Sequence, residues 1–100
     1  MIDLKLRDKK DSELYKRCDE ILHYVWDPIG VQDIPLARDE YYGYLPQVFK
    51  LLKSGADKIK ISEYLDRTEE IDIGLSSNLS KNLEVAKLLI NWRNAIYEEN

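Results

Sequence analysis

The sequence of 100 residues has a single cysteine, a single histidine and no long uninterrupted apolar run. One cysteine, Cys18, cannot form an internal disulfide. The apolar runs are far shorter than the roughly 20 residues that a transmembrane helix needs. The first ten residues, rich in Lys, Arg and Asp, lack the apolar core of a signal peptide. These absences predict a cytoplasmic protein that does not enter a membrane.

The scarcity of histidine and cysteine also restricts the chemistry that the chain can support. There is no Cys/His cluster with zinc-ligand spacing and no glycine-rich phosphate-binding loop before a helix. His23 lies one helical turn from Asp19 and from Asp27, and a His–carboxylate pair can act in acid–base catalysis. Because no nucleophile or second base lies beside it, we interpret His23 as part of a solvated helix surface. Cys18 falls in an apolar stripe and is interpreted as a small buried hydrophobe.

Three carboxylates, those of Glu63, Asp66 and Glu70, share one face of a predicted helix, an arrangement that resembles a carboxylate metal site. They lack the Glu-x-x-His partner that di-metal helical bundles use, so a solvated acidic face is the better interpretation. We therefore expect no catalytic residue, no metal site and no cofactor. The protein is predicted not to be an enzyme.

The composition, with 44% apolar and 34% charged residues, is typical of a globular domain, and 100 residues correspond to one domain with a small core. The net charge of −4 is unevenly distributed: it is −3 over residues 21–49, +3 over residues 50–62 and −4 over residues 63–72. No stretch is basic enough to follow a phosphate backbone, which argues against nucleic acid as a partner. The two acidic zones instead suit a basic protein.

Helical spacing of apolar residues predicts a first helix that ends near Trp26. Asp27 precedes Pro28 and is therefore pushed out of the helical conformation. Asp11 or Ser12 is expected to cap the first turn. The apolar stripe of this helix consists of Leu14, Cys18, Ile21, Leu22 and Val25.

An ordered loop over residues 27–39 is predicted next, followed by a second helix over about residues 41–53. Pro46 fits the first turn of this helix, where its missing N–H costs least, and Gly55 suits the left-handed position after its end. The inner stripe consists of Tyr44, Leu45, Val48, Leu51 and Leu52.

Two further helices are predicted in the second half of the chain. The third begins after Asp57 as its N-cap and ends at Gly74, and the fourth begins after Ser77 or Asn78 and reaches about Glu98. The stripe of the third helix consists of Ile61, Tyr64, Leu65, Thr68 and Ile71. The stripe of the fourth consists of Leu79, Leu83, Ala86, Leu89 or Ile90, Arg93 and Ile96, flanked by Val85 and Trp92.

The predicted fold class is therefore all-α: a small bundle of about four helices in a single domain over residues 1–100, with one long loop after the first helix. No Asn-Gly or Asp-Gly hairpin signal occurs. Residues 1–10 form a short N-terminal arm in which Ile2, Leu4 and Leu6 alternate with polar residues. Three alternatives are predicted for this arm: a lone strand, a segment packed on the helices, or a frayed end.

Six of the ten aromatic residues fall within residues 24–49, together with four carboxylates. Tyrosine and tryptophan anchor many protein interfaces because they bury much area for little lost entropy. Trp26, Tyr41 and Phe49 are expected to pack the loop onto the bundle. Tyr42 is predicted to point outward, which leaves packing and docking as equal alternatives for it.

This region resembles a family of small bacterial helical proteins marked by a Trp-Asp-Pro-Ile-Gly motif, some of which are similar to immunity proteins of contact-dependent growth inhibition systems, while others have no assigned role. The matching residues are Trp26-Asp-Pro-Ile-Gly-Val31, Ala37-Arg-Asp-Glu-Tyr41, Tyr44-Leu-Pro-Gln-Val-Phe49, Leu51-Leu52 and Gly55, with further similarity at Ile73-Gly-Leu75, Val85-Ala86 and Trp92. The similarity covers most of the chain after Cys18. It implies a helical fold and an immunity protein, an antitoxin that neutralises a cognate toxin.

Elementary chemistry accounts for part of this motif as a folding element. Asp27 can accept hydrogen bonds from the N–H groups of the turn that follows Pro28, with Gly30 supplying a permissive backbone. Asp39 can cap the second helix, and Arg38 can pair with Asp27 or Asp33 across the loop. The fold motif is thus predicted to consist of Trp26, Asp27, Pro28, Gly30, Arg38 and Asp39.

The surface that binds a partner is then expected on the acidic third helix. Carboxylates in the last turn of a helix are disfavoured by the helix dipole, so their presence there suggests a function other than stability. The predicted partner-binding residues are Glu63, Asp66, Glu69, Glu70 and Asp72, together with Asp33 and Tyr42 of the loop. The leading hypothesis is a non-enzymatic immunity protein that occludes the basic active-site groove of a toxin, a nuclease. The alternative is a structural or regulatory helical domain that self-associates, at most as a weak homodimer, or binds another cytoplasmic protein.

Overall fold

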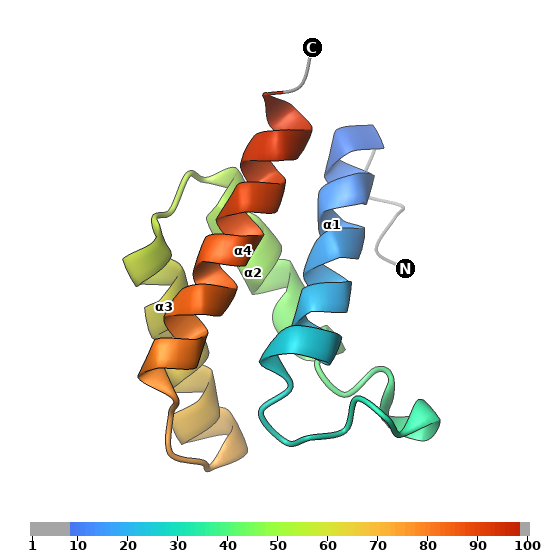
Figure 1. The fold of residues 1–100 in the computed structure, drawn as a ribbon, viewed down its shortest axis with the longest axis vertical. Helices are drawn as coiled ribbons and strands as arrows, with labels where there is room; N and C mark the ends of the chain where they lie inside the picture. Colours follow the sequence, from blue (N-terminus) through green and yellow to red (C-terminus); the bar gives the residue numbers. More distant parts are fainter. Residues whose placement is uncertain (1–8, 99–100) are drawn as a thin grey trace.

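The computed structural model describes residues 9–98, and this part of the chain is an all-α bundle without strands, as predicted (Figure 1). Four α-helices pack together: α1 (Lys9–Ile21), α2 (Leu45–Lys53), α3 (Lys58–Arg67) and α4 (Leu79–Tyr97). The long helix α4 packs against both α3 and α1, and α2 lies against α1. No helix within residues 9–98 combines the length and apolar character that crossing a membrane requires. Most of the predicted N-terminal arm, residues 1–8, lies outside the described residues.

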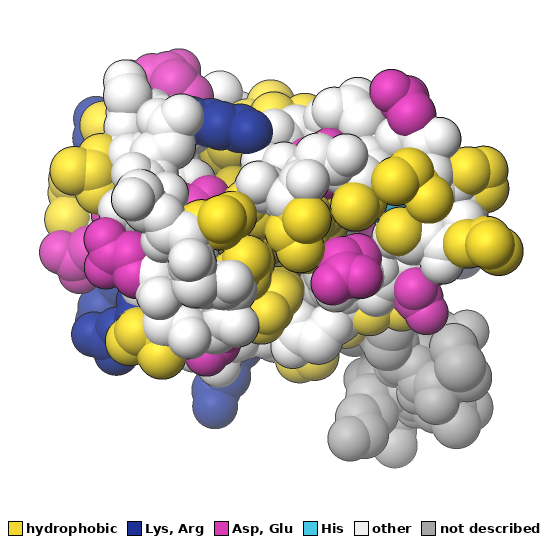
Figure 2. All heavy atoms as spheres, turned by 90° about the horizontal axis from the view of Figure 1, so that it is seen from below, with side chains coloured by type: hydrophobic (Ala, Val, Ile, Leu, Met, Phe, Trp, Pro, Cys, Tyr) yellow, Lys and Arg dark blue, Asp and Glu magenta, His cyan; other side chains and the backbone are white. Residues whose placement is uncertain are grey.

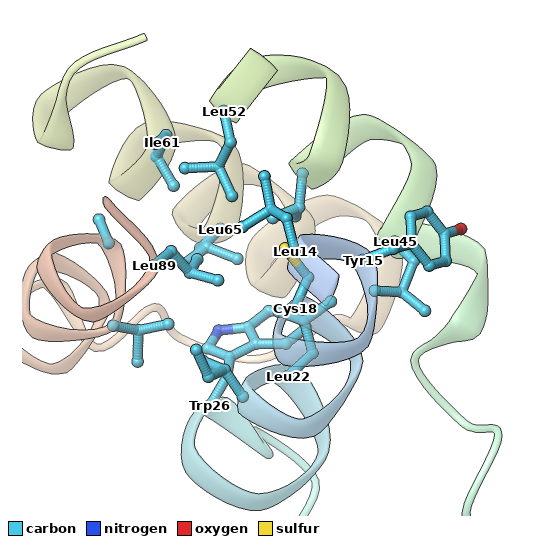
Figure 3. Close-up of a cluster of buried hydrophobic side chains, with 14 of the residues drawn as sticks. Leu14, Tyr15, Cys18, Leu22, Trp26, Leu45, Leu52, Ile61, Leu65 and Leu89 are labelled. Atoms are coloured by element: carbon cyan, nitrogen blue, oxygen red, sulfur yellow. The ribbon is translucent and has the colours of Figure 1, made fainter. Parts of the chain in front are cut away.

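The core lies between the four helices and consists mostly of side chains that the apolar spacing had identified, although Tyr15 was not among them (Figure 3). Leu14 and Cys18 of α1 meet Leu52 of α2, Leu65 of α3 and Leu89 of α4, and all five are fully buried. Burial, reinforced by the adjacent carboxylate of residue 19, raises the pKa of the Cys18 thiol to about 12. The interpretation of Cys18 as a buried hydrophobe is confirmed.

Most predicted helix ends are confirmed because they depend on local chemistry. Asp57 caps α3 by accepting a hydrogen bond from the N–H of residue 60 at 2.9 Å, and Asn78 caps α4 by accepting one from residue 81 at 3.1 Å. Gly55 and Gly74 adopt left-handed conformations, with φ of 84° and 82°, after α2 and after the α3 region. Pro46 lies in the first turn of α2, as expected.

The predicted start of the first helix is wrong. Asp11 and Ser12 lie inside α1, which already includes Lys9, so neither is an N-cap. The carboxylate of Asp11 instead accepts hydrogen bonds from Lys53, at 2.7 Å, and from the hydroxyl of Tyr97. These contacts connect α1 to α2 and to α4 at the end of the bundle where α1 begins and α4 ends (Figure 1).

The first helix changes its winding before it ends. α1 continues into a π-helical turn, η2 (Leu22–Trp26), which holds more residues per turn than an α-helix and so rotates the side chains that follow. Trp26 therefore takes the fully buried position, while Val25, predicted to be in the stripe, is 44% exposed. His23 is only 2% exposed, so its predicted place on a solvated surface is wrong for the same reason.

The third helix ends in the same way, in the π-helical turn η5 (Thr68–Ile73). Ile71, predicted to be in the stripe, is 71% exposed, and Glu69 is buried in its place. In α4 the buried face is shifted by about one residue: Asn82 is buried, whereas Leu79 is exposed and Leu83 is half-buried. Val85, Ala86, Leu89 and Ile96 are buried as expected, whereas Arg93 is half-buried and Trp92 is 37% exposed.

Burial of Trp26 predicts a large loss of stability on truncation. The indole is fully buried against the rings of Tyr41 and Tyr44, with ring centroids 5.3 Å and 6.0 Å away. Trp26→Ala should lower the free energy of unfolding by about 3–5 kcal/mol, measured by urea denaturation. The matched control is Trp92→Ala, which removes a partly exposed indole that contacts the guanidinium of Arg17 and should cost less than about 1 kcal/mol. Equal losses in the two variants would contradict this assignment.

Candidate docking surface

Asp27 organises the loop that follows α1. This residue has a left-handed backbone conformation (φ 30°, ψ 61°), and its carboxylate is buried. Oδ1 accepts hydrogen bonds from the N–H of Gly30 at 3.1 Å, the N–H of Val31 at 2.8 Å and the hydroxyl of Tyr41 at 2.7 Å. Oδ2 accepts hydrogen bonds from the N–H of Gln32 at 3.1 Å and from its side-chain Nε2 at 3.3 Å. The predicted role of Asp27 as an acceptor for the following turn is confirmed.

Tyr41 extends this arrangement toward α2. Its hydroxyl donates to Asp27 and accepts a hydrogen bond from the N–H of Ile29 at 3.0 Å. Burial, together with the neighbouring carboxylate, raises the pKa of Tyr41. Burial alone would raise the pKa of Asp27 as well, but the hydrogen bonds from the loop N–H groups and from Tyr41 outweigh it and lower that pKa. Asp27 is therefore ionised near neutral pH.

Arg38 fixes the far side of the loop, although not through the predicted partners. Its guanidinium forms two hydrogen bonds with Asp19 of α1, at 2.9 and 3.0 Å, and lies over the ring of Tyr24 at 5.4 Å. The predicted pairing with Asp27 or Asp33 is wrong, because the donors of the following loop already occupy Asp27 and Asp33 lies exposed.

The predicted cap at Asp39 is also wrong. α2 begins only at Leu45, after a 3₁₀ turn, η4 (Tyr42–Tyr44), that replaces the expected first turn of the helix. No side chain caps either element, and Asp39 contributes only its backbone carbonyl, which accepts the N–H of Tyr42 at 3.1 Å. The carboxylate of Asp39 is therefore left at the surface.

One end of the bundle exposes many apolar side chains (Figure 2). We call this surface the end face and define it by residues 24–44 and 70–79, two segments that begin within the two π-helical turns. Burial raises the pKa of Tyr44, and the nearby carboxylate of Asp72 raises it further. Because Tyr44 belongs to the first segment and Asp72 to the second, the two segments are neighbours. Of the eleven exposed large hydrophobic side chains among residues 9–98, nine belong to the end face. They are Tyr24, Val25, Ile29, Ile34, Leu36, Tyr42, Ile71, Leu75 and Leu79.

The same face is negatively charged. Its exposed carboxylates are those of Asp33, Asp39, Glu40, Glu70 and Asp72. The sequence has no lysine between residues 17 and 49 and no lysine or arginine between residues 68 and 80. The only arginine of the end face, Arg38, is already bound to Asp19. The end face therefore combines apolar side chains with carboxylates that have little neutralising charge beside them (Figure 2).

Two of the predicted partner-binding carboxylates instead hold the structure together. Glu69 is only 3% exposed and accepts hydrogen bonds from Nδ2 of Asn82 at 2.8 Å and from the N–H of Asn78 at 3.1 Å. Its predicted place on a docking surface is wrong, because the π-helical turn directs it inward. Asp66 is half-buried and accepts a second hydrogen bond from Asn82 at 2.7 Å. The sequence pattern gave no sign of the structural role of Asn82.

The other predicted partner-binding residues lie at the surface. Asp33, Tyr42, Glu70 and Asp72 are exposed on the end face, and Glu70 accepts a hydrogen bond from the hydroxyl of residue 77 at 2.8 Å. Glu63 is exposed farther along α3, outside the end face. The structure thus brings together the acidic and the aromatic segments that the sequence presented as separate candidates.

His23, the remaining candidate, is buried with its ring edge-on to that of Tyr24, and its Nδ1 atom has no hydrogen-bond partner. Within residues 9–98, no three His, Cys, Asp or Glu side chains are grouped so that they could hold a metal ion. The features that distinguish this small helical bundle are therefore the ordered loop and the end face.

Comparison with known proteins gave no match, either to a protein-family model, to a curated protein or to a solved structure. The resemblance to the family with the Trp-Asp-Pro-Ile-Gly motif stays a prediction. The functional argument therefore depends on the geometry and charge of the end face.

The lowered pKa of Asp27 predicts how stability changes with pH. Because the pKa is lower in the folded than in the unfolded chain, Asp27 stabilises the fold above about pH 4 and loses this contribution as the pH falls further. Asp27→Asn should cost about 2–3 kcal/mol at pH 7 and weaken the acid-dependent loss of stability, measured by urea denaturation between pH 7 and 3. Asp33→Asn, at an exposed position, should keep the parental pH profile. Identical profiles for parent and Asp27→Asn would contradict the assignment.

Proposed function

We propose that this chain is a non-enzymatic immunity protein that binds a basic toxin domain, a nuclease, and occludes its active-site groove. The observation that carries the proposal is the end face, where nine exposed hydrophobic side chains are interspersed with five exposed carboxylates. Exposed apolar side chains gathered at one end of a small protein, with charge of one sign among them, are typical of protein interaction sites.

The charge of the end face matches what a nuclease presents. A groove that binds nucleic acid carries Lys and Arg side chains that contact phosphates. Carboxylates at Asp33, Glu70 and Asp72 can take the place of those phosphates, and their field would accelerate association with a cationic groove. Apolar side chains between them, such as Ile71 and Leu75, would exclude water from the contact.

The alternative function, self-association through the same face, is favoured by the exposed apolar side chains alone. In a symmetric dimer each end face would contact its own copy, so the carboxylates of Asp33, Asp72 and their neighbours would approach one another. Such juxtaposition of like charges is unfavourable. Analytical ultracentrifugation separates the two functions, because the immunity protein should remain monomeric or associate only weakly at micromolar concentration.

The proposed function is tested with the protein encoded by the gene immediately upstream, since an immunity gene lies directly behind its toxin gene. Expression of the upstream protein alone should stop growth, and co-expression of this chain should restore it. The two purified proteins should form a complex of defined stoichiometry in size-exclusion chromatography. An upstream protein that is not toxic, or whose toxicity this chain does not relieve, would overturn the proposal.

Neutralising carboxylates of the end face should slow association. In the double variant Asp33→Asn, Asp72→Asn, the association rate with the upstream protein should fall several-fold at low salt and depend less steeply on ionic strength, measured by stopped-flow fluorescence. The control is Glu84→Gln, Glu98→Gln, which changes the net charge by the same amount away from the end face. Equal effects in the two double variants would contradict a site on the end face.

A further inference from the structure

Leu36 is the most exposed large hydrophobic side chain of the described chain. It lies in the 3₁₀ turn η3 (Pro35–Ala37) of the loop and is 96% exposed, whereas the other exposed hydrophobic side chains lie between 37% and 71%. Ile34, two residues earlier, is also exposed. The turn therefore presents apolar side chains to solvent without burying them against the bundle.

The backbone of the turn nevertheless forms internal hydrogen bonds. The N–H of Ala37 donates to the carbonyl of Ile34 at 2.9 Å, and the N–H of Arg38 donates to the carbonyl of Pro35 at 3.2 Å. Proline also restricts φ at the first position of the turn. On one side the loop is held by the Asp27 carboxylate, and on the other by the ion pair of Arg38 with α1.

The backbone of the turn is thus ordered although its apolar side chains are not buried. In most loops an exposed leucine is held loosely, so that binding must pay for ordering it. Here backbone hydrogen bonds already hold the turn that carries Leu36, so that less backbone entropy is lost on association. An exposed apolar side chain on an ordered backbone can fill a pocket of a partner, where its apolar area is removed from water.

We infer that Leu36, supported by Ile34, is an anchor that inserts into an apolar pocket of the partner protein, and that this pocket has a rim of Lys or Arg side chains. The inference deepens the proposed function and rests on it for the identity of the partner. The rim follows from the charges that flank the anchor: Asp33 precedes it, and Asp39 and Glu40 follow it, all three exposed. The same three carboxylates disfavour binding to the end face of a second copy of this chain, because like charges would then approach one another.

The anchor and the carboxylates contribute to different steps of binding. Carboxylates act over a distance and govern the association rate and its salt dependence. An apolar side chain acts only on contact, so Leu36 should govern the dissociation rate and leave the salt dependence unchanged. This difference allows the two contributions to be measured separately.

The first test compares Leu36→Ser with the matched control Ile59→Ser, which removes an exposed apolar side chain at the start of α3, away from the end face. In the complex with the upstream protein, Leu36→Ser should raise the dissociation rate at least tenfold, while Ile59→Ser changes it less than twofold. Circular dichroism should show both variants folded, since neither side chain is buried. A dissociation rate for Leu36→Ser within twofold of the parent would overturn the inference.

The second test does not depend on the upstream protein. A photo-crosslinking phenylalanine derivative is placed at position 36, or at position 59 as control, and the cells that naturally make this protein are irradiated. Position 36 should form an adduct with a protein whose linked peptide contains Lys or Arg residues next to apolar ones, and position 59 should not. Absence of an adduct at position 36, or an adduct with an acidic surface or with a second copy of this chain, would overturn the inference.

The two tests distinguish the failure of the anchor from the failure of the proposed function. If position 36 links to a basic protein that is not a toxin, the anchor is supported and the immunity function is overturned. If this chain neutralises the upstream toxin but Leu36→Ser binds as tightly as the parent, the immunity function is supported and the anchor is overturned.

Discussion

The carboxylate of Asp27 is the group on which the arrangement of the loop depends. A left-handed backbone at a residue other than glycine and a buried charge are each unfavourable alone. Both are offset by donors from Gly30, Val31, Gln32 and Tyr41, which satisfy the two carboxylate oxygens. Because Tyr41 lies just before the second helix of the bundle, this one carboxylate also sets how the chain returns from the end of α1 to the start of α2 (Figure 1).

The other half of the end face is built in a similar way. There too a helix widens into a π-helical turn, a left-handed residue (Gly74) ends it, and a buried carboxylate (Glu69) binds the backbone of the segment that follows. Asn82 links this carboxylate to Asp66, so that the start of α4 is fixed against the end of α3. Two buried acidic groups therefore stabilise the loops that carry the exposed ones.

The sequence predicted those parts of the structure that depend on neighbouring residues. The caps at Asp57 and Asn78, the turn after Asp27 and most of the core follow from local rules, and they are confirmed. Val25 and Ile71 were misplaced because a change of winding from α to π shifts the periodicity, and no residue type marks that change. The partners of Arg38 and Glu69 depend on contacts between helices, which neighbouring residues do not reveal. Of the predicted partner-binding residues, Asp33, Tyr42, Glu63, Glu70 and Asp72 are exposed, whereas Glu69 is buried and Asp66 is half-buried. The exposure of Leu36 depends on where the loop lies and could not be read from its neighbours.

The separation between the Asp27 carboxylate and the exposed side chains of the end face has an evolutionary consequence. None of the groups that donate to Asp27 is an exposed carboxylate or the side chain of Leu36, so substitutions at those positions leave the hydrogen bonds of Asp27 intact. The loop can therefore diversify its surface without a matching change in the core. A scaffold of this kind can acquire a new partner through a few surface substitutions, while selection for folding acts on a different set of residues.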